Sequence, residues 1–222
     1  MDFSKVSTVF FDLDWTLITS VFRDYILPDV YKAAPSFHRY TLDEFFEMFV
    51  STERKFMPRV EAWDPDFIFK EMGLKVSALS LYRKYQDKLE VYPDVLPALD
   101  RLVKRYRLCV LTNSLKEYTD LKVEQTRISH YFEHIFTADQ IGYAKPSPEI
   151  FIRVLKRMGL KNSNAIYVGD SPEMDVPGAR KAGIATFIVN RMGKPIPDGL
   201  RPTVEIKTLT ELPNHLGVVR KT

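Results

Sequence analysis

The sequence has little cysteine, no strong bias of charge and no long hydrophobic run. Its 222 residues include a single cysteine, Cys109, which excludes an intramolecular disulfide framework. Cys109 lies in the apolar run 108–111 without a nearby histidine to activate it, so we expect a buried core thiol. The net charge is only +3 and both signs are mixed along the chain, which argues against a nucleic-acid partner.

Patterns that target a chain to a membrane are also missing. No apolar stretch approaches the roughly 20 residues that a transmembrane helix needs. The start of the sequence has no basic segment followed by an apolar signal core. We therefore expect no membrane partner and a cytoplasmic location. The sequence gives no signal from which to infer an oligomeric state.

Short apolar runs that alternate with helical patterns predict an α/β fold. The predicted strands lie at 6–13, 107–112, 165–169, 184–189 and 203–206. Helical patterns lie at 95–106, 148–158 and 209–216. This alternation predicts a doubly wound, mainly parallel sheet with helices on both faces.

Residues 20–91 do not follow this alternation and carry no convincing strand pattern. Capping residues predict the starts of three helices there, at Thr41 with Glu44, at Asp64 and at Ser77. We therefore expect two units, an α/β core of residues 1–19 and 92–222 and a small helical unit of residues 20–91.

Carboxylates directly follow two of the predicted strands. Asp12 and Asp14 come directly after the apolar run 9–11 of the first strand, and Asp170 follows the strand at 165–169, with Asp175 five positions later. In an open parallel sheet, ligands bind beyond the carboxyl ends of the strands, so these acids are placed for chemistry. Taken one motif at a time, they can equally be turn residues that cap a strand end or the next helix.

Three further polar residues lie at a strand end or before a helix. Lys145 precedes the helix at 148–158, where the helix dipole disfavours a cation unless an anion is close. It can meet a phosphate or neutralise carboxylates, or be an exposed loop lysine. Thr112 and Asn113 end the strand at 107–112 and can bind phosphate oxygens or cap the next helix.

These groups occur in an order that one edge of a sheet can gather. Three carboxylates without a cysteine or histidine cluster suit a hard divalent cation, and oxygen ligands favour Mg²⁺ over zinc. The lysine and the hydroxyl groups then suit an anion held beside that cation.

Four stretches of the sequence resemble the haloacid dehalogenase (HAD)-like hydrolase superfamily. They are FFDLDWTL (10–17), VLTNS (110–114), GYAKPSPEIF (142–151) and VGDSPEMDVPGARKAG (168–183), in the family's order. The resemblance covers about residues 6–20 and 92–190. It implies a Rossmann-like core, a mobile helical cap inserted after the first strand, and a Mg²⁺-dependent phosphatase acting on a small organic phosphate.

The resemblance also implies catalytic and substrate-binding roles. Asp12 would be the nucleophile that forms an aspartyl-phosphate, and Asp14 would protonate the leaving alcohol and later activate water. Lys145 would balance charge and orient the nucleophile and the phosphate. Thr112 would bind phosphate oxygens, with Asn113 assisting.

A metal site is implied in the same way. Mg²⁺ would be held by the Asp12 and Asp170 carboxylates and by the backbone carbonyl of Asp14. Asp175 would be an outer ligand or a more distant acid. One departure from the family pattern is Trp15, which we expect either to shape the pocket or to pack under the cap.

Three alternative functions stay open. A 2-haloacid dehalogenase would use the same fold, but such enzymes lack an aspartate at the position of Asp14. A phosphomutase would pass phosphate to a sugar hydroxyl, and the helical unit carries no clear sugar signature. A non-catalytic binding or regulatory module need not retain Asp12, Asp14, Lys145 and Asp170 together.

Overall fold

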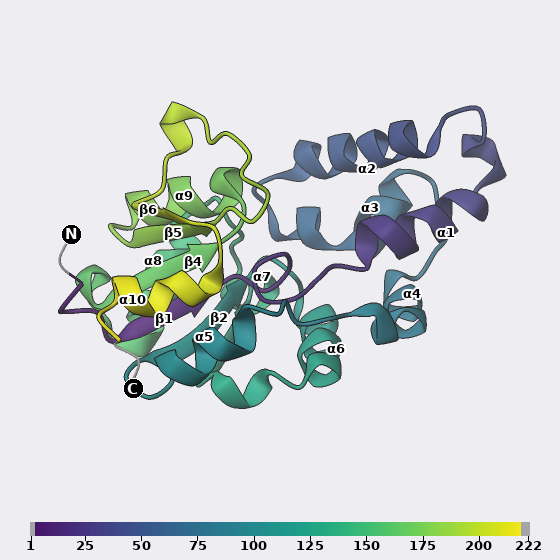
Figure 1. Cartoon of the computed structure of the whole chain (residues 1–222). Coiled ribbons are helices and arrows are strands. Elements are labelled where there is room, and N and C mark those ends of the chain that lie inside the picture. Colours follow the sequence, from purple (N-terminus) through teal and green to yellow (C-terminus); the bar gives the residue numbers. More distant parts are fainter. Residues whose placement is uncertain (1–2, 219–222) are drawn as a thin grey trace.

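The computed structural model describes residues 3–218; residues 1–2 and 219–222, which fall in the predicted core, lie outside the described residues. Within this range, six strands form one parallel sheet (Figure 1). The strands are β1 (Thr8–Phe11), β2 (Arg107–Thr112), β3 (His134–Thr137), β4 (Ala165–Gly169), β5 (Ala185–Val189) and β6 (Val204–Ile206). Their spatial order is β3-β2-β1-β4-β5-β6, which confirms the predicted α/β, Rossmann-like core.

The α-helices within the described range fall into two groups. The first four lie within residues 20–91: α1 (Leu27–Lys32), α2 (Leu42–Phe56), α3 (Pro65–Glu71) and α4 (Ala78–Lys84). The others alternate with the strands or follow them: α5 (Val95–Leu102), α6 (Lys116–Thr126), α7 (Ala138–Ile141), α8 (Pro148–Met158), α9 (Pro172–Lys181) and α10 (Leu212–His215). None of the helices in residues 3–218 combines the length and the apolar character needed to cross a membrane.

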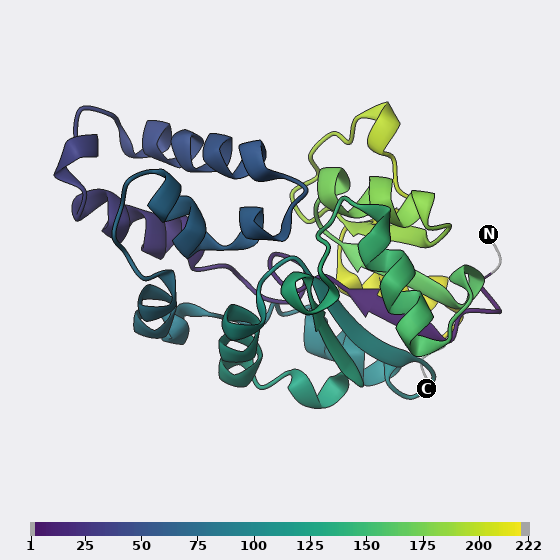
Figure 2. The same ribbon diagram turned by 180° about the vertical axis from the view of Figure 1, so that it is seen from behind.

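Alternate residues of the buried strands pack into two hydrophobic cores, one for each face of the sheet. Val9 and Phe11 of β1 belong to one core, together with residues of α5 and α10. Phe10 belongs to the other core, together with Cys109 and residues of α8 and α9. Figures 1 and 2, which view the molecule from opposite sides, show these helices on opposite faces of the sheet. Cys109 is buried, as predicted.

The position of β1 decides where the functional residues meet. β1 lies between β2 and β4, in register with 107–110 of one and 165–168 of the other. The chain therefore leaves three adjacent strands at the same edge of the sheet, at Asp12, Thr112 and Asp170. This is the edge at which open parallel sheets bind ligands.

Most predicted elements are present, with a few differences. α8 begins at Pro148 after the N-cap Ser147 and ends at Gly159, whose φ of 64° is left-handed, as the sequence predicts. The last predicted helix, 209–216, is a short 3₁₀ turn followed by α10. β3 was not predicted, because this edge strand of four residues is only partly buried and lacks a continuous apolar run.

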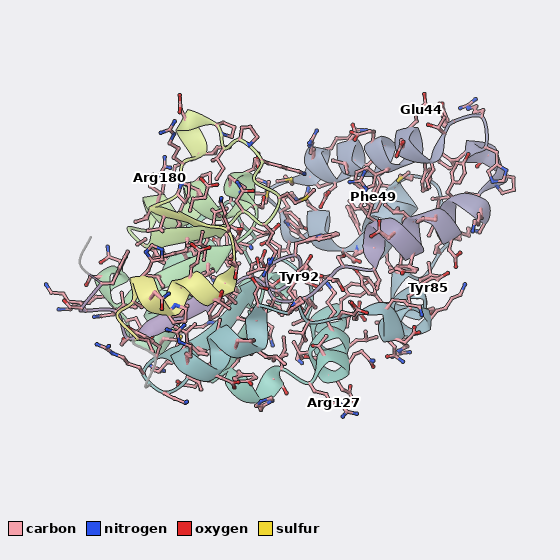
Figure 3. All side chains as sticks on the ribbon, in the orientation of Figure 1. Glu44, Phe49, Tyr85, Tyr92, Arg127 and Arg180 are labelled. Atoms are coloured by element: carbon pink, nitrogen blue, oxygen red, sulfur yellow. The ribbon has the colours of Figure 1, made fainter. Side chains whose placement is uncertain are left out.

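Residues 20–91, all described, form helices to one side of the sheet and contain no strand (Figure 1). Thr41 and Glu44 form the predicted capping box at the start of α2. The interior of this segment is aromatic: Phe49 of α2 points toward α3 (Figure 3), with its ring centroid 5.4 Å from that of Phe69. α1 and the π-helical turn before it were not predicted from the sequence.

Candidate active site

A cavity of about 420 Å³ lies between the carboxyl edge of the sheet and the helical segment. Its lining includes most of the residues singled out from the sequence, namely Asp12, Asp14, Thr112, Asn113, Lys145 and Asp170. The helical segment contributes a largely apolar wall, with Phe22, Phe46, Phe49, Val50, Trp63 and Tyr82. The structure thus brings residues from three strand ends and one loop to the floor of a single pocket.

Lys145 is the centre of the polar network at the floor of this pocket. Its side chain is only 2% exposed, and its Nζ lies 2.9 Å from Asp12 Oδ2 and 2.8 Å from Asp175 Oδ1. Nζ also donates to the Tyr167 hydroxyl at 2.6 Å, and that hydroxyl donates to the carbonyl of Leu111. Burial acts to lower the pKa of Lys145, but the carboxylates of Asp12 and Asp175 outweigh it and raise this pKa above its ordinary value. Lys145 is therefore a permanent buried cation.

One lysine does not balance the acids that surround it. Carboxylate oxygens of Asp12, Asp170 and Asp175 lie within 4.8 Å of one another. Burial raises the pKa of Asp12 to about 6, against the opposing effect of Lys145. Burial, with the charges of Asp175 and Asp12, raises the pKa of Asp170 to about 8. Such excess negative charge, presented as carboxylate oxygens, is what a hard divalent cation would neutralise, so these donors fit Mg²⁺.

Asp175 differs from the other two acids because both of its oxygens already accept hydrogen bonds. Oδ1 meets Lys145, and Oδ2 accepts from the backbone N–H of Ser171 at 3.0 Å. The side chain is fully buried, and Gly169 makes room for it, since a Cβ at Gly169 would lie 2.0 Å from Asp175 Oδ2. These contacts suit a residue that orients Lys145; direct or outer metal ligation by Asp175 stays a prediction.

Asn113 and Thr112 occupy different positions in the pocket. The Asn113 side chain accepts from the Lys145 backbone N–H at 2.7 Å and donates to the Lys145 carbonyl at 3.0 Å, so it fixes the loop that carries the lysine. A contact between Asn113 and substrate would then use its backbone N–H. The Thr112 hydroxyl accepts from the N–H of Ser114 at 3.1 Å, which leaves its own proton for an anion. Substrate binding by both residues stays a prediction.

The loop after β1 is held by residues that the sequence analysis did not select. The Thr16 hydroxyl donates to Asp170 Oδ1 at 3.1 Å. Arg191 donates to the carbonyls of Trp15 and Thr16, both at 2.9 Å, and pairs with Asp94 at 3.0 Å. Its guanidinium also lies 4.1 Å from the centroid of the Tyr92 ring, at the junction of sheet and helical segment (Figure 3). No local sequence pattern identifies Arg191, because its partners are distant along the chain.

Trp15 occupies an unusual backbone position. Its φ is 61°, in the left-handed region that favours glycine or asparagine. The side chain lines the pocket and is 41% exposed. Of the two expectations for this residue, the structure agrees with the one in which Trp15 shapes the pocket.

Asp14 pairs with a second buried lysine that the sequence analysis also missed. Lys122 of α6 is 3% exposed, and its Nζ lies 2.7 Å from Asp14 Oδ2. Burial acts to lower the pKa of Lys122, but Asp14 and Tyr82 outweigh it, so that this pKa is raised. Because the Asp14 side chain pairs with Lys122, the predicted metal contact of Asp14 would be made by its backbone carbonyl. A lysine in a polar helix gives no signal of burial in the sequence.

The sequence and the structure both have relatives among known proteins. The chain is 37% identical over 139 residues to a glyceraldehyde 3-phosphate phosphatase of Methanopyrus kandleri, an alignment that covers 60% of this chain and 58% of that protein. It is 27% identical over 214 residues to a phosphoglycolate phosphatase of Aliivibrio fischeri, covering 88% and 90% of the two chains. The crystal structure of a HAD phosphatase from Thermococcus onnurineus has a TM-score of 0.82 at 33% identity, covering 97% of this chain and all of that one.

A family model extends this similarity across the pocket residues. The model for haloacid dehalogenase-like hydrolases matches residues 6–183, which include the loop after β1 and the ends of β2 and β4. The matched region also contains the buried lysine between the acids. The chain therefore belongs to the haloacid dehalogenase-like hydrolase family.

Proposed function

We propose that this chain is a Mg²⁺-dependent phosphohydrolase that cleaves a small organic phosphate monoester through a phosphorylated Asp12. The observation that carries the proposal is the pairing of Asp12 with Lys145 at 2.9 Å on the floor of a pocket that Asp14 also lines. The Lys145 ammonium holds the Asp12 carboxylate and opposes the repulsion between two anions, the carboxylate and the phosphate ester. The phosphatases among the relatives support the same reaction.

In the first half of the reaction, an oxygen of Asp12 attacks phosphorus. The new bond joins Asp12 to the phosphoryl group as the bond from phosphorus to the ester oxygen breaks. Asp14 gives its proton to the departing oxygen, so that an alcohol leaves. Lys145 keeps the attacking carboxylate oriented throughout this step.

In the second half, water removes the phosphoryl group from Asp12. Asp14, now a carboxylate, takes a proton from the water as its oxygen attacks phosphorus. The bond between phosphorus and the Asp12 oxygen breaks, which restores the Asp12 carboxylate and releases inorganic phosphate. Asp14 is protonated again and ready for the next ester.

Asp12, Asp170 and the Asp14 carbonyl would hold the metal. When bound, Mg²⁺ supplies positive charge that neutralises the phosphate oxygens and the crowded carboxylates. The Thr16 hydroxyl already orients Asp170 by donating a hydrogen bond to its Oδ1. We also propose that Thr112 and the backbone N–H of Asn113 bind phosphate oxygens.

The helical segment is proposed to be a cap that selects the substrate. The unit of residues 20–91 covers the pocket that the core, residues 1–19 and 92–222, opens at the sheet edge. A pocket of about 420 Å³ with a mostly apolar wall suits a small organic leaving group better than a protein substrate. As expected from the sequence, we also propose that the protein works in the cytoplasm.

Asp14 separates this proposal from a 2-haloacid dehalogenase. A 2-haloacid dehalogenase expels a halide and needs no acid at this place, whereas an alkoxide leaving group does. A non-catalytic module would gain nothing from two buried lysines paired with Asp12 and Asp14, because such buried charges are expensive to keep. A phosphomutase stays the nearest alternative, since only the acceptor of the phosphoryl group differs.

Turnover of p-nitrophenyl phosphate tests the proposal. We expect release of p-nitrophenol that requires Mg²⁺ and stops when a chelator is added. Asp12→Asn, whose amide is a poor nucleophile, should lower kcat by about 10³-fold or more while circular dichroism shows an intact fold. Metal-independent release by the wild-type protein would remove the metal from the mechanism, and normal turnover by Asp12→Asn would remove Asp12 as the nucleophile.

A further inference from the structure

Lys122 is a buried cation that the reaction described above does not use. It projects from α6 of the core, and its side chain is 3% exposed although the helix carries mostly polar residues. Burying an ammonium group is unfavourable unless it is paired and hydrogen-bonded. The partners of Lys122 therefore indicate what the buried charge is for.

Those partners come from three separate parts of the chain. The ammonium of Lys122 lies 2.7 Å from Asp14 Oδ2 and donates to the Ser114 hydroxyl at 3.1 Å. The centroid of the Tyr82 ring, from α4 of the helical segment, lies 5.1 Å from the same Nζ. The ring of Tyr82 is itself buried and packs on Tyr118 of α6 with centroids 5.1 Å apart. The lysine is thus fixed from the core and covered from the helical segment.

The two oxygens of Asp14 are left in different situations by this arrangement. Oδ2 is bound by Lys122, whereas Oδ1 is buried and has no hydrogen-bond partner within the described part of the chain. An acid that must pass a proton to and from a substrate needs its carboxyl group held in a fixed orientation. Contact with Lys122 through Oδ2 supplies that condition.

From these contacts, and resting on the proposed phosphohydrolase function, we propose that Lys122 is a positioning residue: it anchors Asp14 by Oδ2 and so fixes the carboxyl group that exchanges the proton with the leaving group and then with water. Lys122 also lines the pocket, and its role in this proposal is exerted through Asp14 rather than by contact with the phosphate. Because Tyr82 covers the ammonium, the helical segment helps to keep water from competing for the ion pair.

Two aryl esters that differ in their need for an acid test this inference. Phenyl phosphate has a poor leaving group that needs protonation, whereas the leaving group of p-nitrophenyl phosphate departs largely without it. We expect Lys122→Met to lower kcat for phenyl phosphate by about tenfold or more and for p-nitrophenyl phosphate by much less. Lys122→Arg, which keeps a cation, should recover part of the loss.

A double-mutant cycle shows whether Lys122 works through Asp14. In an Asp14→Asn background, Lys122→Met should add almost no further loss on phenyl phosphate, because the group it positions is already gone. Lys116→Met, at an exposed lysine on the same helix, is the matched control and should behave like the wild type. Should Lys122→Met unfold, Lys122→Gln, which keeps a hydrogen-bond donor, allows the same comparison.

The failures of the two proposals are distinguishable. Absence of Mg²⁺-dependent turnover in the wild-type protein overturns the phosphohydrolase and this inference with it. An active wild type combined with equal losses on both esters overturns the inference alone. So does a Lys122→Met effect of the same size with and without the Asp14 carboxylate, since Lys122 would then act independently of Asp14.

Discussion

Two lysine side chains of this protein hold a positively charged ammonium group in a buried position. Lys145 and Lys122 are both almost fully buried, and each ammonium meets a carboxylate of the loop after β1 at less than 3 Å. Removing one member of such a pair leaves the other buried and unpaired, which costs more than the pair contributes. The two lysines therefore fix Asp12 and Asp14 independently, one from the loop before α8 and one from α6.

Substitutions at Trp15 can separate the effect of the side chain on stability from the effect of the backbone conformation. Because φ is 61°, alanine at this position is strained whereas glycine is not. Trp15→Ala and Trp15→Gly lose the same indole ring, so their comparison isolates the backbone. We expect the free energy of unfolding, measured with urea, to be about 1 kcal/mol higher for Trp15→Gly than for Trp15→Ala. Equal stability, or a more stable alanine variant, would contradict the strained backbone.

At the level of elements, the junction of β4 and α9 places the acid that orients Lys145. β4 ends at Gly169, and the first turn of α9 contains Asp175. The absence of a side chain at Gly169 lets the Asp175 carboxylate approach the strand and reach Lys145. The strand end and the helix start thus act together on a residue from a third element.

Gly169→Ala is expected to disturb this junction. The added Cβ would lie 2.0 Å from Asp175 Oδ2, so the Asp175 side chain or the end of β4 must shift, which disturbs the contact with Lys145. We expect a loss of about 1–3 kcal/mol in stability and a fall in kcat on p-nitrophenyl phosphate. The matched control is Gly199→Ala, where a Cβ meets nothing within 4 Å, and its stability should change by less than about 0.5 kcal/mol. Similar behaviour of the two variants would show that the close approach at Gly169 is unimportant.

The elements that the sequence predicts are those with strong local signals. β2, β4 and α8 have continuous apolar runs or clear caps, so their bounds follow from nearby residues. β3 is a partly buried edge strand, and α6 has only a weak apolar periodicity, so neither is evident without its neighbours. Their stability comes from tertiary packing, which local patterns do not encode.

The same distinction holds for the site. Asp12, Asp14, Lys145 and Asp170 stand in motifs and were identified from the sequence, and the structure brings them to one pocket. Lys122 and Arg191 were missed, because each contacts a residue more than 100 positions away. Asn113 was identified too, but the two hydrogen bonds that its side chain makes with the Lys145 backbone follow only from the fold. Motifs therefore predict which residues take part, and packing decides what supports them.

In the molecule as a whole, the pocket lies between the edge of the sheet and the helical segment of residues 20–91. Both contribute charged residues to its lining. Glu53 of α2 also lines the pocket. Burial raises the pKa of Glu53 to about 7, with Arg54 opposing this shift. A carboxyl group with a raised pKa binds its proton more tightly in the folded state than in the unfolded one. Folded-state stability therefore falls as the pH rises from below 4.5 through about 7.

Glu53→Gln should remove this pH dependence, because an amide does not ionise. We expect the variant to match the wild type near pH 4 and to exceed its free energy of unfolding near pH 8 by at most about 3 kcal/mol. Denaturant titrations across this pH range measure the difference. Glu47→Gln, at an exposed position of the same helix, is the control. A constant difference between Glu53→Gln and the wild type at all pH values would show that folding does not raise the pKa of Glu53.

The central claim is that the phosphoryl group passes through Asp12, and the stereochemistry at phosphorus tests it most directly. A phosphorothioate ester made chiral with two oxygen isotopes is hydrolysed in water labelled with the third, and the configuration of the released inorganic thiophosphate is determined. Two successive in-line displacements, first by Asp12 and then by water, predict net retention of configuration. Net inversion would mean that water attacks the ester directly, and it would contradict the account.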